Sequence, residues 1–164
     1  MRLIIAILYA ICATPVFAQD FKIDPHLIDR CFPIVDDPML CVGREAYDCI
    51  FRNGGGPNMV LGACYEAEAA VWDDFLNEAY RDLMSLAHDL ESSDSGWETG
   101  VLVNTLRGMQ RSWIVYRDAR CANAVALAKP FGSRASAASA FCQMEETARQ
   151  YFVLRGMRKD YEFH

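Results

Sequence analysis

The sequence predicts an all-α protein, an antiparallel bundle of three main helices with a small disulfide-rich helical N-terminal cap. Three observations predict this class. Apolar residues recur at three- and four-residue steps over three long segments. No alternating run of β-branched residues occurs after the N-terminal stretch, and clusters of glycine and proline separate the periodic segments.

The first residues have the features of a cleavable secretory signal. Arg2 supplies a positive charge, and residues 3–12 form an apolar run that is shorter than the about 20 residues needed to cross a bilayer. Ala18 is a small residue at the expected cleavage point. We therefore predict a signal peptide over residues 1–18, no membrane anchor after cleavage, and a periplasmic or secreted product. An uncleaved membrane anchor is the alternative.

The cysteines indicate structural disulfides. Cys12 is removed with the signal, which leaves an even set behind an export signal, and such a set favours disulfides over metal ligands. No C-x-x-C pair and no histidine at zinc-site spacing accompanies them. We predict no metal and no cofactor. Six cysteines allow fifteen pairings, of which we favour the sequential one: Cys31 with Cys41, Cys49 with Cys64, and Cys121 with Cys142.

The charge of the chain bears on its partners. The formal net charge is −6 at pH 7, and loss of Arg2 with the signal makes it −7. An acidic protein is disfavoured as a ligand of nucleic acid or of an anionic membrane, and it is steered towards a basic partner.

Residues 19–57 form the predicted cysteine-rich cap. Asp24 and Pro25 are typical of the start of a short helical turn. Asp37 and Pro38 repeat this pattern, which predicts a second short helix near residues 38–51. Three glycines and a proline then break the chain over residues 52–57.

The first long helix is predicted over residues 59–90, with Asn58 as its cap. Its apolar stripe contains one charged residue, Glu68, which does not fit the pattern. The opposite face is polar and comprises Glu66, Asp73, Asp74, Asn77, Arg81 and Asp82.

Two further long helices follow a polar turn over residues 91–96. The second begins around Trp97 and ends before Lys129. Its predicted stripe is Val101, Leu102, Leu106, Met109, Trp113, Tyr116, Arg120 and Ala124. The third covers residues 135–157, with a stripe of Ala138, Phe141, Met144, Ala148, Tyr151, Phe152 and Arg155. We group residues 58–158 as one helical domain.

Polar residues share a face of the second long helix with a tryptophan. Gln110, Trp113 and Arg117 lie at positions i, i+3 and i+7. We expect Arg117 to stack on Trp113 and to reach a carbonyl or carboxylate on another helix. Arg149 is a similar candidate on the third helix. The favoured interpretation is that these groups fix helix register, and direct contact with a ligand is the alternative.

These segments resemble the LprI-type lysozyme inhibitor family, with its LprI N-terminal-like domain. The resemblance covers residues 45–155 and is carried by a set of motif residues: Trp72, Asp73, Leu76, Asn77, Tyr80, Gln110, Trp113, Arg117 and Arg149. It implies a small exported helical domain with disulfides, in some members able to bind and inhibit lysozyme. Two features depart from the family pattern. The gap between Cys49 and Cys64 is longer than usual, and Cys31 and Cys41 lie outside the family's core.

The sequence does not favour catalysis. The histidines His26, His88 and His164 stand apart from one another, no G-x-S-x-G motif occurs, and most carboxylates fall on a solvated helix face. We expect a non-catalytic protein that occludes a basic lysozyme. An extracytoplasmic structural or interaction module for another envelope partner is the alternative, and a hydrolase with paired carboxylates is the weakest hypothesis.

An inhibitor must present a protruding feature to its partner, and two turns qualify, residues 52–58 and residues 91–98. We favour the second turn because tryptophan is a common interface anchor. The candidate contact residues are Glu91, Asp94, Trp97 and Glu98. The alternative is that Trp97 packs beneath the start of its own helix.

Overall fold

The computed structural model describes residues 21–93 and 96–162 of the chain. The predicted signal peptide, residues 1–18, and the candidate contact Asp94 lie outside the described residues. Within them the chain forms five α-helices and three short 3₁₀ helices, and no strand. The predicted all-α class is confirmed.

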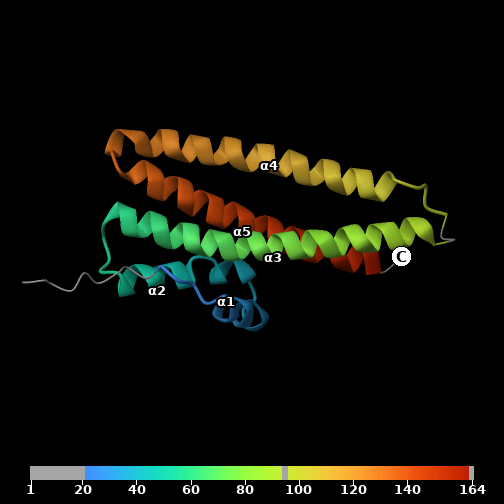
Figure 1. Cartoon of the computed structure of the whole chain (residues 1–164), viewed down its shortest axis with the longest axis horizontal. Helices are drawn as coiled ribbons and strands as arrows, with labels where there is room; N and C mark the ends of the chain where they lie inside the picture. The colour runs from blue at the N-terminus through green and yellow to red at the C-terminus, as the bar shows by residue number, and fades with distance from the viewer. Residues whose placement is uncertain (1–20, 94–95, 163–164) are drawn as a thin grey trace, which may run out of the picture.

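Three long helices form the body of the protein (Figure 1). They are α3 (Asn58–Ser92), α4 (Val101–Ala128) and α5 (Arg134–Glu162). α4 runs antiparallel to both α3 and α5, so the bundle has an up-down-up path. α5 packs extensively along α3 and along α4, whereas α3 and α4 touch each other far less. α5, the third of the long helices, is therefore the central helix of the bundle.

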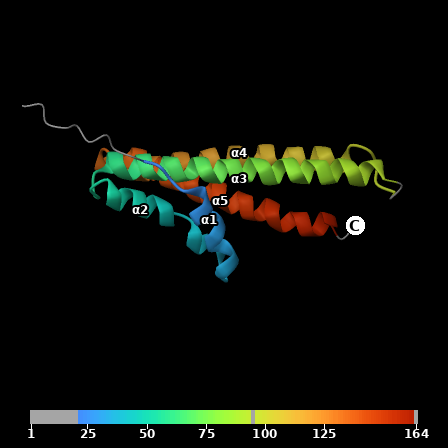
Figure 2. The same ribbon diagram turned by 60° about the horizontal axis from the view of Figure 1, so that its bottom comes forward.

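The N-terminal cap packs on α3 on the side away from α4 (Figures 1 and 2). It consists of α1 (Pro25–Cys31), the 3₁₀ helices η1 (Phe32–Ile34) and η2 (Pro38–Cys41), and α2 (Arg44–Arg52). Asp24 and Asp37 cap their turns as predicted, since each Oδ1 accepts a backbone N–H bond at 2.9 Å, from His26 and Met39 respectively.

The single helix predicted over residues 38–51 is wrong. The chain forms η2, bends, and begins α2 only at Arg44. The bend lies at Gly43, whose φ of 87° is in the left-handed region that glycine adopts without strain. The apolar residues that were assigned to one helix therefore belong to two separate elements, η2 and α2.

Three helix ends also differ from the prediction, and one of them is the end of α5, which continues to Glu162 rather than to residue 157. α3 continues to Ser92, and α4 begins at Val101 rather than around Trp97. Asn58 is the first residue of α3, but its side chain does not cap the helix. Its Nδ2 donates instead to Ser133 Oγ at 2.8 Å, which links the start of α3 to the turn between α4 and α5. The short 3₁₀ helix η3 (Lys129–Phe131) follows α4 within that turn.

The core has two adjoining parts. Around the fully buried Trp72, α3 and α5 meet the cap, and Phe32 of η1 brings its ring to 5.8 Å from that of Phe152. Farther along the bundle, Leu76, Leu83, Leu106 and Leu154 form an aliphatic part. The predicted stripe of α3 therefore serves both parts.

The stripe predicted for α4 is partly wrong. Val101 and Tyr116 are exposed, while Val103 and Gln110 are buried. α4 packs mainly on one neighbour, α5. Its buried face is therefore narrow and includes polar residues. For this reason the spacing of apolar residues alone predicted a buried face that is rotated about the helix axis from the observed one.

Three disulfides connect these elements with the predicted sequential pairing. Cys31–Cys41 joins α1 to η2, and Cys49–Cys64 joins α2 to α3. Cys121–Cys142 joins α4 to α5. The cap is thus covalently fixed to the bundle, and each bridge of this loop size contributes about 3 kcal/mol in the chain-entropy description.

Candidate functional site

The outer side of α3 concentrates negative charge. We call the set of exposed carboxylates there the acidic face: Glu66, Asp73, Asp74, Glu78, Asp82 and Asp89. Within α3, all of which the structure describes, Arg81 is the only Lys or Arg residue. The buried stripe of the helix packs against α5 and the cap. Glu78 and Asp82 lie at the edge of the acidic face, where they also line a groove shared with α1 and α5. The polar side predicted from the sequence is therefore exposed, and its charge is nearly all of one sign.

Two members of the acidic face have partners. Asp73 accepts a hydrogen bond from Asn77 Nδ2 at 2.8 Å, one turn along the helix. Asp82 forms an ion pair of 3.2 Å with Arg158 of α5, and both side chains are about half exposed. An exposed ion pair of this kind is weak, so Asp82 stays accessible to a competing cation.

The turn between α3 and α4 lies at one end of the bundle (Figure 1). Trp97 is 38% exposed and Glu98 is exposed. We call Trp97 and Glu98 the tip. Partly accessible tryptophan side chains are common anchors at protein interfaces.

Glu91 has a different role from the one predicted. It is 9% exposed, and its two oxygens accept backbone N–H bonds from Gly100 at 2.8 Å and Val103 at 3.0 Å. Burial by itself would raise the pKa of Glu91, but these backbone donors lower the pKa below its ordinary value. The structure assigns Glu91 to capping of α4, where a carboxylate also interacts favourably with the helix dipole.

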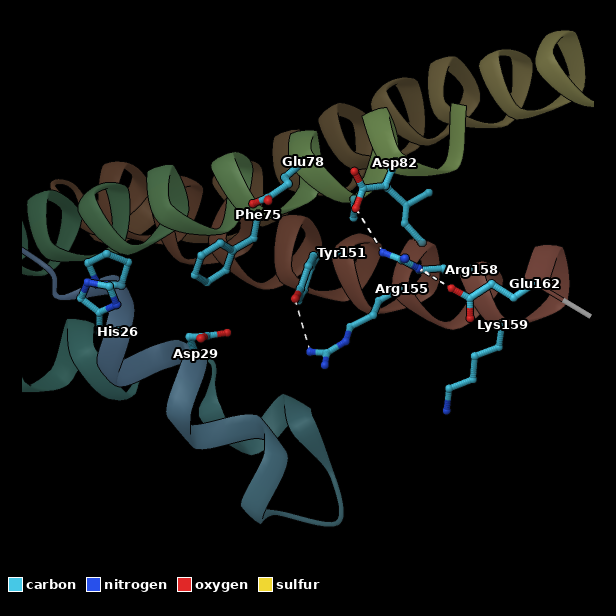
Figure 3. Close-up of a pocket in the computed structure, with 13 residues that line it drawn as sticks. His26, Asp29, Phe75, Glu78, Asp82, Tyr151, Arg155, Arg158, Lys159 and Glu162 are labelled. Atoms are coloured by element: carbon cyan, nitrogen blue, oxygen red, sulfur yellow. Dashed lines mark hydrogen bonds and ion pairs between the residues drawn. The ribbon is translucent and has the colours of Figure 1, made fainter. Parts of the chain in front are cut away.

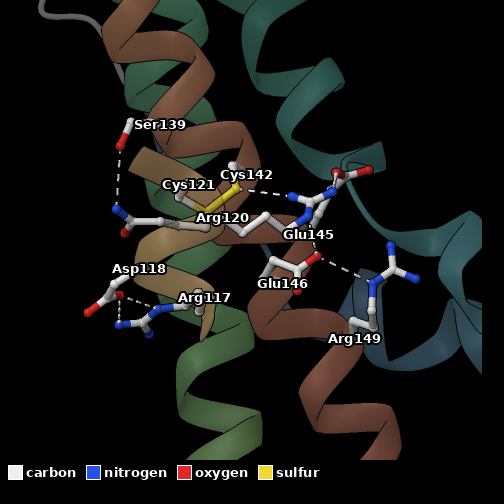
Figure 4. Close-up of a disulfide and its surroundings, with 10 residues drawn as sticks. Arg117, Asp118, Arg120, Cys121, Ser139, Cys142, Glu145, Glu146 and Arg149 are labelled. Carbon is white, nitrogen blue, oxygen red and sulfur yellow. Dashed lines mark hydrogen bonds and ion pairs between the residues drawn. A yellow bond between two sulfur atoms is a disulfide. The ribbon is translucent and has the colours of Figure 1, made fainter. Parts of the chain in front are cut away.

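Polar side chains form a seam between α4 and α5. Gln150 Nε2 donates to Gln110 Oε1 at 3.0 Å, and both side chains are buried. Arg120 reaches Glu146 across the helix pair at 3.2 Å (Figure 4). The buried carboxylate of Glu146 is also 3.5 Å from Arg149. These contacts support the interpretation that polar groups on this face set the register of the helices.

The prediction for Arg117 is half correct. Its guanidinium lies 5.0 Å from the ring centre of Trp113, as expected from the spacing. However, it pairs with Asp118 on its own helix at 2.8 Å rather than with another helix (Figure 4). Arg120 makes the contact with another helix instead, because this residue, three positions after Arg117, faces α5.

Glu68 has a structural role that its sequence pattern did not predict. It is fully buried, and its oxygens accept N–H bonds from Gly43 at 2.6 Å, Ala46 at 2.7 Å and the Trp72 indole at 2.9 Å. Its position as the one charge on an apolar stripe was the available signal.

The nine motif residues divide by exposure. Trp72, Leu76 and Gln110 are buried, and Tyr80, Trp113 and Arg117 are half-buried. Asp73, Asn77 and Arg149 are exposed. The motif therefore consists largely of residues that maintain the bundle, and only a minority of them is accessible to a partner.

A groove of about 760 Å³ lies between α1, α3 and α5 (Figure 3). Phe75, Tyr151 and Leu154 contribute its apolar lining. Its four carboxylates, Asp29, Glu78, Asp82 and Glu162, are all exposed, and Arg158 of α5 pairs with the last two. This is an open surface of mixed charge, whereas glycoside hydrolysis uses a carboxyl pair set on either side of one bond.

The described residues contain neither a cluster of metal-ligand side chains nor a membrane-spanning helix. No group of three or more His, Cys, Asp or Glu residues among them is arranged to hold a metal ion. No helix within residues 21–93 or 96–162 has the length and apolar character to cross a bilayer.

Comparison with known proteins adds one finding to this geometry. The family model described as lysozyme inhibitor LprI matches residues 55–154, which include α3, α4 and most of α5. The cap helices α1 and α2 precede the matched range. No curated protein and no solved structure matches the chain.

Proposed function

The chain belongs to the LprI lysozyme inhibitor family, and on that basis we propose that it is an exported, non-catalytic protein that binds a basic lysozyme and blocks its cleft. The observation that carries the proposal beyond the family is the acidic face of α3. Lysozymes of the animal type are basic proteins, so a surface of one negative sign would steer their approach and favour their binding.

The cysteine chemistry supports export. All six cysteines of the described residues are engaged in disulfides, and such bridges persist in oxidising compartments outside the cytoplasm. We propose that residues 1–18 are the cleaved signal and that the mature protein is periplasmic or secreted. We also propose that residues 19–57 act as a cap that stiffens the helical domain of residues 58–158.

The tip supplies the second part of the proposed contact. Trp97 and Glu98 share the end of the bundle where α3 ends and α4 begins. A tryptophan inserted into a cleft buries a large apolar area at small cost in conformational entropy. In this arrangement the acidic face provides attraction and the tip provides occlusion.

The proposal is tested by the rate at which a basic lysozyme clears bacterial cell walls in the presence of the purified mature protein. We expect inhibition at low salt that weakens at high salt, because the attraction between exposed charges is screened. Asp74→Asn with Glu78→Gln, on the acidic face, is expected to weaken inhibition.

The matched control is Asp36→Asn with Asp160→Asn, which removes the same charge from exposed positions outside α3. Equal effects of the two double variants would show that only net charge matters and would refute the assigned surface. Undiminished lysozyme activity at a large excess of folded protein would refute inhibition itself.

A further inference from the structure

The end of the bundle opposite the tip has a different chemistry from the rest of the protein. The turn from α2 to α3 and the turn from α4 to α5 both lie there (Figures 1 and 2). Four large apolar side chains at these turns are strongly exposed: Phe51 at 84%, Met59 and Leu127 at 70%, and Phe131 at 63%. We call them, together with the cations described next, the basic end.

Basic side chains accompany these apolar groups. Arg134 lies 5.5 Å from the centre of the Phe131 ring, and Lys129 is exposed in the same turn. On the other turn, Arg52 is exposed and donates from Nη2 to the backbone oxygen of Lys22 at 2.9 Å, which places a further cationic residue nearby. The hydrogen bond between Asn58 and Ser133 ties the two turns together.

Acidic residues are absent from the two sequence segments that form this end of the bundle. Residues 49–65 and residues 119–144 contain no Asp or Glu, although the whole chain has 22 of them. Neither Lys129 nor Arg134 forms an ion pair with a described residue. On the α2 side, the exposed Asp48 lies one helical turn before Arg52, so the cationic character is strongest at the turn between α4 and α5. A protein of net charge −6 therefore carries, at that turn, a local surface that is both cationic and apolar.

We propose that the basic end docks on the surface of an anionic phospholipid bilayer. Exposed aromatic and aliphatic side chains gain by entering the boundary between headgroups and acyl chains, and adjacent Lys and Arg residues are attracted to anionic lipids. Neither contribution requires a membrane-spanning helix. The segregation of charge adds orientation, because the acidic face is repelled by the same lipids that attract the basic end.

This orientation has a consequence for the rest of the molecule. α3 has 35 residues, so at 1.5 Å per residue it extends about 50 Å. A molecule that stands on its basic end holds Trp97 and Glu98 away from the bilayer, at the opposite end of α3. The lipid contact and the proposed lysozyme contact then use separate surfaces of one protein.

The test is co-sedimentation of the mature protein with lipid vesicles. We expect binding to vesicles of phosphatidylcholine mixed with phosphatidylglycerol, little binding to phosphatidylcholine alone, and loss of binding at high salt. Lys129→Gln with Arg134→Gln is expected to lower the partition coefficient roughly tenfold or more. Leu127→Ala with Phe131→Ala is expected to lower it comparably, through lost insertion.

Matched controls remove the same groups elsewhere. Arg107→Gln with Arg111→Gln removes two cations from the other half of α4, and Ile34→Ala with Leu40→Ala removes two exposed apolar side chains from the cap. Neither control is expected to change vesicle binding. Equal losses in variants and controls, or no binding to anionic vesicles, would overturn the proposal.

Two other occupants of the basic end would also be detected. A change in oligomeric state on Leu127→Ala with Phe131→Ala would assign the end to a second copy of the chain and refute the lipid assignment. Loss of lysozyme inhibition by Lys129→Gln with Arg134→Gln would assign it to the protein partner and refute separate surfaces. Vesicle binding is measured without lysozyme, so its failure and a failure of the proposed inhibition remain distinguishable.

Discussion

The carboxylate of Glu68 on α3 accepts a hydrogen bond of 2.6 Å from the backbone N–H of Gly43, the glycine at which the cap bends. The same carboxylate accepts the N–H of Ala46 in the first turn of α2. A single buried side chain therefore satisfies backbone donors at the start of α2, donors that a helix leaves without intrahelical partners. It also fixes the cap to the first long helix, next to the Cys49–Cys64 disulfide.

Glu68→Gln is expected to destabilise the protein by about 1–3 kcal/mol, because one of the three N–H donors then faces an amide NH₂ group and loses its acceptor. Urea unfolding measures the change. Glu66→Gln, on the exposed side of the same helix, is the control and is expected to change the unfolding free energy by less than about 0.5 kcal/mol. Equal effects of the two changes would contradict the role of Glu68.

Glu91 predicts a dependence of stability on acid. Although burial opposes it, the backbone donors of α4 hold the pKa of Glu91 below its ordinary value. Its contribution to stability is therefore complete above the ordinary glutamate pKa and is lost as the pH falls through the lower pKa of the folded state.

The stability gap between wild type and Glu91→Gln is thus expected to shrink as the pH falls from 7 into this window. Unfolding free energies measured over that range test it, with the exposed Glu98→Gln as control. A gap that stays constant down to the lowest pH would show that ionisation of Glu91 contributes nothing.

The hydrogen bond between Gln110 and Gln150 is buried in the seam between α4 and α5. Gln110→Leu leaves the amide of Gln150 without this partner and is expected to cost about 1–3 kcal/mol. The double change Gln110→Leu with Gln150→Leu is expected to recover most of that loss, because two apolar groups then pack together. A double-mutant cycle on unfolding free energies measures the coupling, and additive losses would contradict it.

The disulfide between Cys121 and Cys142 joins the central helix to its less extensively packed neighbour. Replacing both cysteines by alanine is expected to lower the unfolding free energy by about 3 kcal/mol in the chain-entropy description. Thermal unfolding of the variant and of the wild type under non-reducing conditions checks the value. Unchanged stability would mean that packing alone holds α4 on α5.

Much of the fold followed from the sequence because its signals are local. The spacing of apolar residues located α3 and α5, and the cap residues Asp24 and Asp37 marked the turns they begin. The disulfide pairing was also predicted, because each bridge links elements that are close along the chain.

The errors arose where tertiary contacts decide the outcome. Glu91 lies in a polar stretch that is typical of a turn, yet the return of the chain makes it the cap of α4. Arg117 was expected to make a cross-helix contact, but the rotation of α4 on α5 gives that contact to Arg120 instead. The basic end could not be predicted from the net charge of the chain, because its cationic residues come from two turns that are distant in sequence.

Inhibition of a basic lysozyme by the acidic face and the tip is the central function proposed for this protein. The decisive measurement is a titration of lysozyme activity on cell walls with the folded, disulfide-bonded protein at low and at high salt. We expect activity to fall to a saturable low level as inhibitor is added at low salt, and to require markedly more inhibitor at high salt. Full activity at a large molar excess, under both conditions, would contradict the account.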